Sequence, residues 1–355
     1  MTPRHARHGR LAAAWLAIGL LCLGGDRQPL AARANVLQAP ARQARAAVRI
    51  DEERLIQDVR TLASPDLEGR LTGSAGSRRA RAIIVERFER LQLRPFNGSY
   101  EQAFSFTQTR GGRKQEFPDA SNVMGYITGR RDPQSYIVVS AHFDHLGVRE
   151  GKTYPGADDN ASGVAALLAI AGWFVEHQPG KSLLFVAFDA EEQGLQGSKH
   201  FVAHPPVPLD RIAAVVNMDM IGRGDANRLF VAGTHHHPSL KPVVSAAASG
   251  RALEVAFGHD TPSAQASGAD DWTNSSDHGP FHAAGIPFLY FGVEDHPDYH
   301  KPTDTADKIP RRFYREATEL VLETVRRMAE IEDRGIAGSG DRDSELGTRD
   351  CGLGT

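Results

Sequence analysis

Imidazole and carboxylate side chains occur where apolar runs of this sequence end or are interrupted. His142 and Asp144 follow the β-branched, apolar run 136–139, and Asp219 lies within the apolar run 215–221. Side chains that bind metals or substrates are typical of the carboxyl ends of buried strands in open α/β sheets. Metal-assisted hydrolysis is therefore the chemistry that we expect these residues to serve.

His142 and Asp144 are two residues apart, so on an extended backbone both side chains point to the same face. A metal-binding histidine usually donates its second ring N–H to a carboxylate, and Asp144 could accept it. We expect His145 to face away, because successive side chains of a strand alternate. Taken alone, His-x-Asp is a weak signal, for which a surface loop is the simpler explanation.

Asp158, Asp159 and Asn160 crowd a turn that leads into a helix beginning near Ser162. An ordinary helix N-cap accounts for one such side chain. Because three polar side chains exceed what a cap needs, we expect at least one carboxylate to bind cations.

Two acidic residues, Glu191 and Glu192, follow the predicted strand 183–188. Neighbouring side chains diverge, so one carboxylate can bind a metal while the other faces the substrate water as a base. A solvated acidic turn is the plain alternative for this pair. Asp219 is more informative, since an ionised carboxylate is costly to bury unless it is paired or metal-bound.

The last candidate donor, His300, lies in a loop after the predicted strand 287–291. A plain loop histidine is its alternative, and we expect the histidine triplet 235–237 to form a solvated loop of that kind. Imidazole and carboxylate donors without thiolate favour zinc, ahead of manganese or cobalt. Two such ions, about 3.5–4 Å apart, can share one carboxylate. The predicted metal ligands are His142, Asp159, Glu192, Asp219 and His300.

From residue 122 onward, apolar runs of β type alternate with longer helical stretches. This alternation predicts a largely parallel sheet with helices on both faces. The expected fold class is α/β, in three α/β/α layers around a central mixed, mostly parallel sheet. The predicted strands are 137–141, 183–188, 212–218, 229–232 and 287–291, and the predicted helices are 51–62, 75–91, 162–176, 195–203, 240–249 and 312–331, with a loop at 64–73.

Residues 1–34 have the pattern of a secretory signal peptide. A segment with three arginines precedes the apolar stretch 11–23, and the small-x-small triplet 32–34 offers a cleavage site. The apolar stretch is too short for an ordinary membrane span. We therefore expect an exported protein, periplasmic or secreted, without stable membrane association after cleavage. An uncleaved anchor is the alternative.

After the leader we expect a linker at 35–50, one folded domain at 51–334 and a disordered tail at 335–355. The formal net charge is −3, and residues 1–34 hold five arginines and one aspartate, so the remainder carries −7. A mildly acidic chain argues against a nucleic-acid partner. One of the two cysteines lies in the leader, so no internal disulfide remains after cleavage.

Several blocks of this sequence together resemble peptidase family M28, which contains the co-catalytic zinc aminopeptidases of bacteria. The resemblance covers about residues 51–331, weakly at first and strongly from residue 122, and its blocks are jointly highly specific. The blocks are His-x-Asp-His-Leu-Gly at 142–147, Pro-Gly-Ala-Asp-Asp-Asn-Ala-Ser-Gly at 155–163, Glu-Glu at 191–192, Asn-Met-Asp-Met-Ile-Gly at 217–222 and Tyr-His-x-x-x-Asp-Thr at 299–305.

The resemblance implies a monomeric, secreted aminopeptidase that removes N-terminal residues from peptides and holds two Zn²⁺ per chain. In such an enzyme Asp159 would bridge the two ions. His142 and Asp219 would complete the first zinc site, and Glu192 and His300 the second.

The same resemblance assigns roles around the metals. Glu191 would be the general base and acid, Asp144 the partner of the His142 ring, and Tyr299 a residue that stabilises the oxyanion. The resemblance also suggests a cis peptide between Asp159 and Asn160.

Two features depart from many members of the family. No protease-associated domain precedes the strand 137–141, and the pocket loop 258–274 matches nothing that can be transferred, so the side-chain preference stays open. A carboxypeptidase- or dipeptidase-like exopeptidase would need a basic pocket, for which Lys301 is a candidate. A one-zinc enzyme similar to glutaminyl cyclase is the other alternative, but the presence of both His142 and Asp219 argues against it.

Overall fold

The computed structural model describes residues 48–331, except for residues 225, 263–267 and 269. The predicted leader and the predicted tail lie outside the described residues, as does most of the predicted linker. No helix in the described part of the chain combines the length and the apolar composition needed to cross a bilayer.

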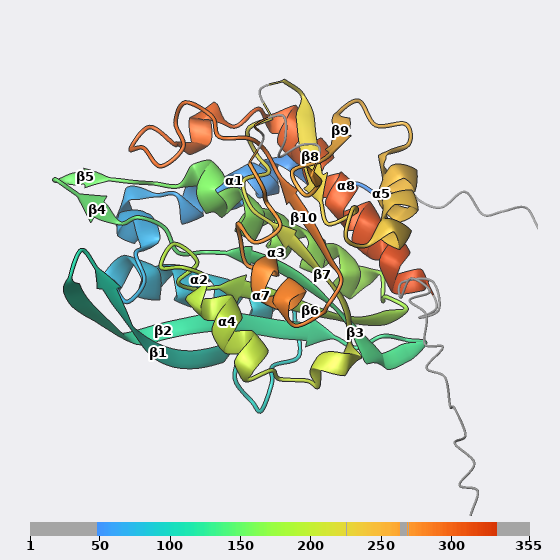
Figure 1. Ribbon diagram of the computed structural model, residues 1–355, viewed down its shortest axis with the longest axis horizontal. Helices are drawn as coiled ribbons and strands as arrows, with labels where there is room; N and C mark the ends of the chain where they lie inside the picture. The colour runs from blue at the N-terminus through green and yellow to red at the C-terminus, as the bar shows by residue number, and fades with distance from the viewer. Residues whose placement is uncertain (1–47, 225, 263–267, 269, 332–355) are drawn as a thin grey trace, which may run out of the picture. The chain divides into compact units, whose positions relative to one another are not determined.

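A mixed sheet of eight strands runs through the centre of the fold (Figure 1). Its four inner strands, β6, β3, β7 and β10, are parallel, whereas β2 and β8 pair antiparallel to the outer two of these. The predicted α/β class with a mixed central sheet is confirmed. In spatial order the strands are β1 (Glu101–Arg110), β2 (Arg113–Ile127), β6 (Lys181–Phe188), β3 (Asp132–His142), β7 (Ile212–Met218), β10 (Phe288–Gly292), β8 (Arg228–Ala232) and β9 (Glu254–Phe257), and a separate hairpin joins β4 (Val148–Arg149) to β5 (Lys152–Thr153).

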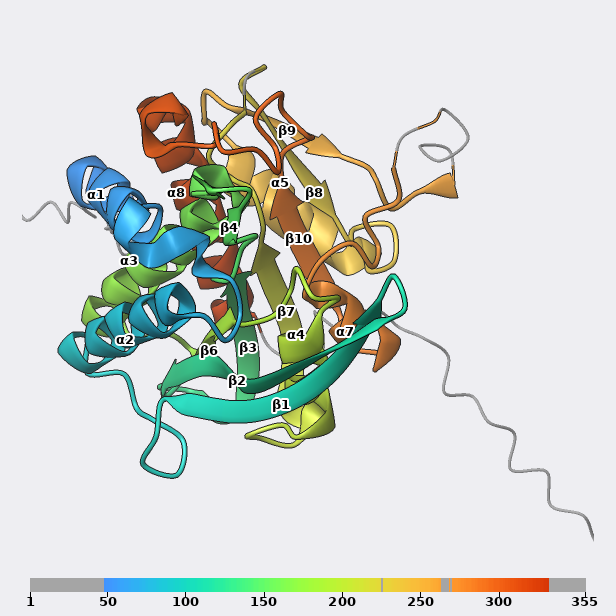
Figure 2. The ribbon, with the colours of Figure 1, turned by 90° about the vertical axis from the view of Figure 1, so that its left-hand side faces the viewer.

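Helices cover both faces of the sheet, and Figure 2 shows α1, α2 and α3 on one side and α4 and α7 on the other. One layer contains α1 (Glu52–Leu62), α2 (Ala75–Arg90), α3 (Gly163–Glu176), α5 (Lys241–Ala248) and α8 (Arg311–Glu330), and the other contains α4 (Gln196–Ala203) and α7 (His278–Ala283). Short helical turns lie at η1 (Pro65–Arg70), η2 (Ala157–Ser162), η3 (Leu209–Arg211), η4 (Pro238–Leu240) and η5 (Ala306–Lys308).

The alternation of side chains along the inner strands explains the two layers. In β3, Ile137 and Val139 pack into the core beneath the larger helical layer, whereas Val138 packs on the opposite face with Phe201 of α4 and Phe281 of α7. Because strand side chains alternate with a period of two, an unbroken apolar run fills both faces. This is why the inner strands could be predicted from composition.

The hairpin β1–β2 was not predicted, and neither were β9 and α7. The first four residues of β2 are exposed and polar, and β1 alternates polar residues with Phe104 and Phe106. A hairpin of this kind at the edge of a sheet shows no continuous apolar run, so hydropathy alone does not reveal it.

A buried tyrosine ties α8 to the start of α3. The Tyr314 hydroxyl donates a hydrogen bond of 2.6 Å to the carbonyl oxygen of Ser162, and the side chain is fully buried. We expect Tyr314→Phe to lower the free energy of unfolding by about 1 kcal/mol, because one buried hydrogen bond is lost. Urea unfolding measures this loss. Tyr126→Phe is the matched control, since the half-buried Tyr126 hydroxyl makes no hydrogen bond among the described residues. Equal stability of both variants and the wild type would contradict the expectation.

Candidate metal centre

The carboxyl ends of the parallel strands meet at one edge of the sheet, and the predicted ligands lie there. His142 is the last residue of β3, Asp219 directly follows β7, and Glu192 lies in the turn after β6. Asp159 comes from η2, which leads into α3, and His300 comes from the loop after β10. Five separate segments therefore deliver the five predicted donors to one place.

Three of these residues form what we call the first donor group: His142, Asp159 and Asp219. The Nε2 atom of His142 lies 3.1 Å from Oδ1 of Asp219 and 3.4 Å from Oδ1 of Asp159. All three side chains are buried, and one ligand atom of each lies within 4.8 Å of the others. One imidazole and two carboxylates at this separation fit a zinc ion.

Asp159 belongs equally to a second donor group, which we define as Asp159, Glu192 and His300. The Nε2 atom of His300 lies 3.0 Å from Oδ2 of Asp159 and 3.4 Å from Oε1 of Glu192. The two oxygens of Asp159 therefore face different imidazoles, as a bridging carboxylate requires. The donor atoms and the shared carboxylate fit two zinc ions.

His145 lies at the second donor group, contrary to the expectation that it faces away. Its Nδ1 atom is 2.7 Å from Oε1 of Glu192 and 3.7 Å from Oδ2 of Asp159, and the side chain is fully buried. The prediction was wrong because β3 ends at His142, so the alternation of an extended strand does not continue to His145. The sequence indicated this position only through the presence of a second imidazole in the block 142–147.

The other residues of the acidic turn hold Asp159 in place. Asp158 accepts a hydrogen bond from the Gly222 backbone at 2.7 Å, and Asn160 donates one to the Met218 carbonyl at 2.9 Å. Asp304 accepts the backbone N–H groups of both Asp158 and Asp159 at 3.0–3.1 Å. The peptide between Asp159 and Asn160 is cis, as the resemblance suggested. Sequence reasoning did not assign Asp304 a role, although it lies in the same block as His300.

Asp144 lies next to the His142 ring, but its backbone carbonyl rather than its carboxylate is within hydrogen-bond distance of that ring. The ring Nδ1 atom of His142 lies 3.7 Å from Oδ1 of Asp144 and only 3.1 Å from the Asp144 carbonyl oxygen. The carboxylate accepts the backbone N–H groups of Glu191 and Glu192 at 3.0 and 3.3 Å. Asp144 therefore links the loop after β3 to the turn that carries both glutamates.

The fully buried side chain of Arg70 connects several loops around the centre. Arg70 donates hydrogen bonds of 2.6–2.9 Å to the carbonyl oxygens of Leu62, Phe143, Pro155 and Gly156. Burial lowers the pKa of Arg70 to about 10, although nearby carboxylates such as Asp159 favour its charge. The guanidinium thus remains a cation behind the acidic donors. Sequence reasoning placed Arg70 in a loop and gave it no role.

The carboxylates strongly favour protonated imidazoles in this structure. For His142, burial opposes the charged form, but Asp219 and Glu191 outweigh it and raise the pKa well above its usual value. For His300, burial is likewise outweighed by hydrogen bonds to Asp159 and Glu192, which raise the pKa to about 10. The same contacts hold the pKa of Asp159 well below its usual range despite burial.

Glu191 and Tyr299 line a pocket of about 350 Å³ that opens onto both donor groups. Burial and the negative charge of Asp219 raise the pKa of Glu191 well above its usual value, although His142 acts in the opposite direction. Burial and the charge of Asp159 also raise the pKa of Tyr299, so its hydroxyl stays protonated. The Tyr299 ring stacks on His300 with ring centroids 3.9 Å apart.

Within the part of the chain that the structure describes, the remaining histidines belong to neither donor group. His235 and His236 are exposed in a turn, as expected, and His237 is half-buried. His278 is buried, and its Nε2 atom lies 2.7 Å from the Trp272 carbonyl oxygen, to which it donates a hydrogen bond.

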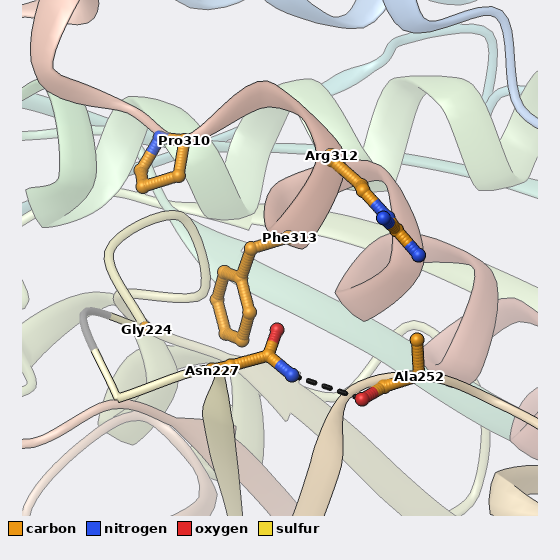
Figure 3. A pocket seen from close by; sticks show the side chains of 6 residues that line it. All are labelled: Gly224, Asn227, Ala252, Pro310, Arg312 and Phe313. Carbon is orange, nitrogen blue, oxygen red and sulfur yellow. Dashed lines mark hydrogen bonds between the residues drawn. The ribbon is translucent and has the colours of Figure 1, made fainter.

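A second, larger pocket of about 560 Å³ lies at the start of α8 (Figure 3). The Phe313 ring fills its inner side against Gly224, and Asn227 donates a hydrogen bond of 2.9 Å to the Ala252 carbonyl. Pro310 and Arg312 complete its lining. Among the described residues, no imidazole or carboxylate lines this pocket.

With this geometry in view, the comparisons with known proteins identify the family. The model of peptidase family M28 matches residues 122–325, and the chain belongs to this family. Aminopeptidase YwaD of Bacillus subtilis is 32% identical over 198 residues, which cover 53% of this chain and 40% of YwaD. A probable zinc metalloprotease of Pyrenophora tritici-repentis is 33% identical over 132 residues, which cover 33% of this chain and 30% of that protein. The matched part thus spans less than half the length of these relatives.

Solved structures share the fold. A zinc aminopeptidase from Bacillus subtilis superposes with a TM-score of 0.62 at 19% identity, covering 81% of this chain and 98% of that one. A glutaminyl cyclase from Porphyromonas gingivalis superposes with a TM-score of 0.63 at 19% identity, covering 78% of this chain and 98% of that one. At such identities the likeness shows the fold alone. Only the residues of the site can distinguish aminopeptidase chemistry from glutaminyl cyclase chemistry.

Zinc binding to the metal-free protein is expected to release protons at pH 7. The raised pKa values mean that His142 and His300 are protonated there, whereas a zinc ligand must be a neutral imidazole. Zinc affinity should therefore rise with pH. Calorimetric titration with zinc in two buffers of different ionisation enthalpy measures the released protons, and we expect about one per imidazole. Identical heats in both buffers would show that the imidazoles are already neutral.

Proposed function

We propose that this chain is an exported metallo-aminopeptidase that hydrolyses N-terminal residues from peptides with two zinc ions. The observation that carries the proposal is the position of Asp159, whose two oxygens face the imidazoles of different donor groups. Bound zinc would supply Lewis acidity that activates water and polarises the scissile carbonyl. The first donor group would hold one ion and the second donor group the other.

In this mechanism Glu191 is the general base. Its side chain lines the pocket beside both donor groups without contributing to either, so the carboxylate is free to accept a proton from a water in the pocket. Glu191 would take a proton from the attacking water and return it to the leaving amine. Asp144 supports this role by accepting the Glu191 backbone N–H, which fixes the turn that presents the carboxylate.

Tyr299 is the proposed donor to the developing oxyanion. Its hydroxyl keeps its proton because the pKa is raised, so it can donate a hydrogen bond throughout the physiological pH range. Stacking on His300 holds the ring at the pocket wall. The two aromatic rings would therefore be positioned together.

The pocket favours an apolar N-terminal side chain. Met220, Trp272, Tyr290 and Val293 are among the residues that line it. Trp272 is held rigidly, since it stacks on His259 with ring centroids 3.7 Å apart and meets Tyr290 edge-on. An apolar side chain gains free energy on entering such a surface, whereas a charged one loses hydration.

Two alternative enzyme functions are distinguished by the experiments described below. A glutaminyl cyclase with one zinc would need only part of the donor set, whereas two donor groups are available here. A carboxypeptidase- or dipeptidase-like enzyme would need a cation for the substrate carboxylate. Lys301 is exposed and donates to the Pro297 carbonyl, and it is not among the residues that line the pocket.

The location and partners of the protein are part of the same proposal. The signal pattern of residues 1–34 supports export to the periplasm or medium. Peptides are the proposed partners of the pocket. We propose that the protein acts as a monomer without stable membrane association, and that it binds no nucleic acid.

Removal of metal should abolish hydrolysis of leucine p-nitroanilide, and zinc should restore it. The expected result follows because no residue of the pocket replaces the Lewis acid. The control substrate is N-acetyl-leucine p-nitroanilide, which an aminopeptidase should leave intact. Full activity after exhaustive dialysis against a chelator would refute the metal mechanism. Cleavage of the blocked substrate would refute the exopeptidase reading, and ammonia release from N-terminal glutamine would favour the cyclase.

Glu191→Gln should keep both zinc ions and lower kcat by about 10²–10⁴-fold, because the base is lost while the ligands remain. Metal content by mass spectrometry and steady-state kinetics measure the two effects. Glu192→Gln is the matched control at the neighbouring position, where metal should be lost together with activity. Wild-type kcat in Glu191→Gln would exclude Glu191 as the base.

A further inference from the structure

We propose that His145 is a positioning residue that holds the Glu192 carboxylate for the second zinc ion, while His300 supplies the imidazole ligand. The inference rests on the proposed two-zinc function. Both imidazoles lie near Asp159 and Glu192, and by distance alone either could be the zinc ligand. The proposal assigns a different role to each of them.

The distances distinguish the two rings. Nδ1 of His145 is 2.7 Å from Oε1 of Glu192 but 3.7 Å from Asp159, which is the pattern of a hydrogen bond to one partner. Nε2 of His300 lies more evenly between them, at 3.0 Å from Asp159 and 3.4 Å from Glu192. Because an ionised carboxylate only accepts hydrogen bonds, His145 must donate through Nδ1.

The two rings also differ in their access to the pocket. His300 lines the pocket and its side chain is 38% exposed, whereas His145 is fully buried and is absent from the pocket lining. His145 therefore approaches Glu192 from behind, on the side away from the substrate. A residue in this place can orient a ligand without meeting the reacting atoms.

The surroundings of His145 fix its ring. A Cβ atom at Gly156 would lie 2.6 Å from ring atoms Cγ and Cδ2 of His145, so glycine at this position leaves the room that the imidazole occupies. The backbone N–H of His145 lies 3.4 Å from the Arg70 carbonyl oxygen, and the Arg70 guanidinium binds the carbonyls of Phe143 and Gly156. The ring is thus enclosed by segments that Arg70 ties together.

Stability alone would not favour an imidazole here. Nε2 of His145 is buried, and no protein group among the described residues pairs with it. Burying a polar atom without a partner is unfavourable, so an apolar ring would suit the packing better. The hydrogen bond to Glu192 is the feature that an apolar ring could not provide.

The test compares two substitutions of His145 by their zinc affinities. His145→Phe keeps a ring and removes the donor, whereas His145→Asn keeps a donor at the position of Nδ1. Competition with a chromophoric chelator, with zinc alone as the probe, measures two dissociation constants for each protein. We expect His145→Phe to weaken the second zinc about 10–100-fold and to leave the first within about twofold, and we expect His145→Asn to retain most of the second affinity.

Circular dichroism confirms that each variant is folded at the assay temperature, and His145→Ala replaces His145→Phe if the larger ring prevents folding. His237→Phe is the matched control for loss of an imidazole elsewhere. Equal loss of both zinc ions would point to a merely structural role. Loss of the second zinc in His145→Asn as well, together with its retention in His300→Asn, would make His145 the ligand. Either result overturns the proposal.

Failure of the underlying function gives a different result. If the wild-type protein binds fewer than two zinc ions, the two-metal proposal fails whatever the variants do. If the wild type binds two and cleaves peptides, but His145→Phe binds both normally, only the role of His145 is refuted.

Discussion

The carboxylate of Asp159 lies between two imidazoles, and the arrangement of the centre depends on this position. One oxygen faces His142 and the other faces His300. Because a single carboxylate spans only a short distance, the two donor groups can lie no further apart than this side chain allows. The strand that ends at His142 and the loop that carries His300 must therefore meet at the turn before α3.

Much of the surrounding structure serves to hold that turn. Asp304 accepts its backbone N–H groups, Asn160 binds the end of β7, and the buried Arg70 binds carbonyl oxygens on the loops beside it. These contacts fix the backbone rather than the side chain of Asp159. A bridging carboxylate needs this support, since its charge is buried and it would otherwise turn toward a single partner.

Electrostatics explains why the centre suits cations. Several carboxylates share a small volume, and they raise the pKa of His142 and of His300 despite the burial of both rings. Burial, together with the charge of Asp219, raises the pKa of Glu191. Divalent cations would relieve the repulsion among these carboxylates by replacing the protons of the two imidazoles. Arg70 supplies one permanent positive charge from behind, but all its described hydrogen bonds go to carbonyl oxygens, so it cannot replace a cation inside the donor groups.

The sequence by itself predicted the inner strands, most of the helices and five candidate donors that the structure brings together, because apolar runs and the polar residues that follow them are visible in local composition. It did not reveal the hairpin β1–β2, whose edge position exposes polar side chains. It also misplaced His145 and gave Arg70 and Asp304 no role. These three residues act through contacts with segments distant in the chain, such as His145 with Glu192 and Asp304 with Asp159. Only the tertiary structure could decide them, since side-chain direction after a strand ends depends on how the loops pack rather than on spacing.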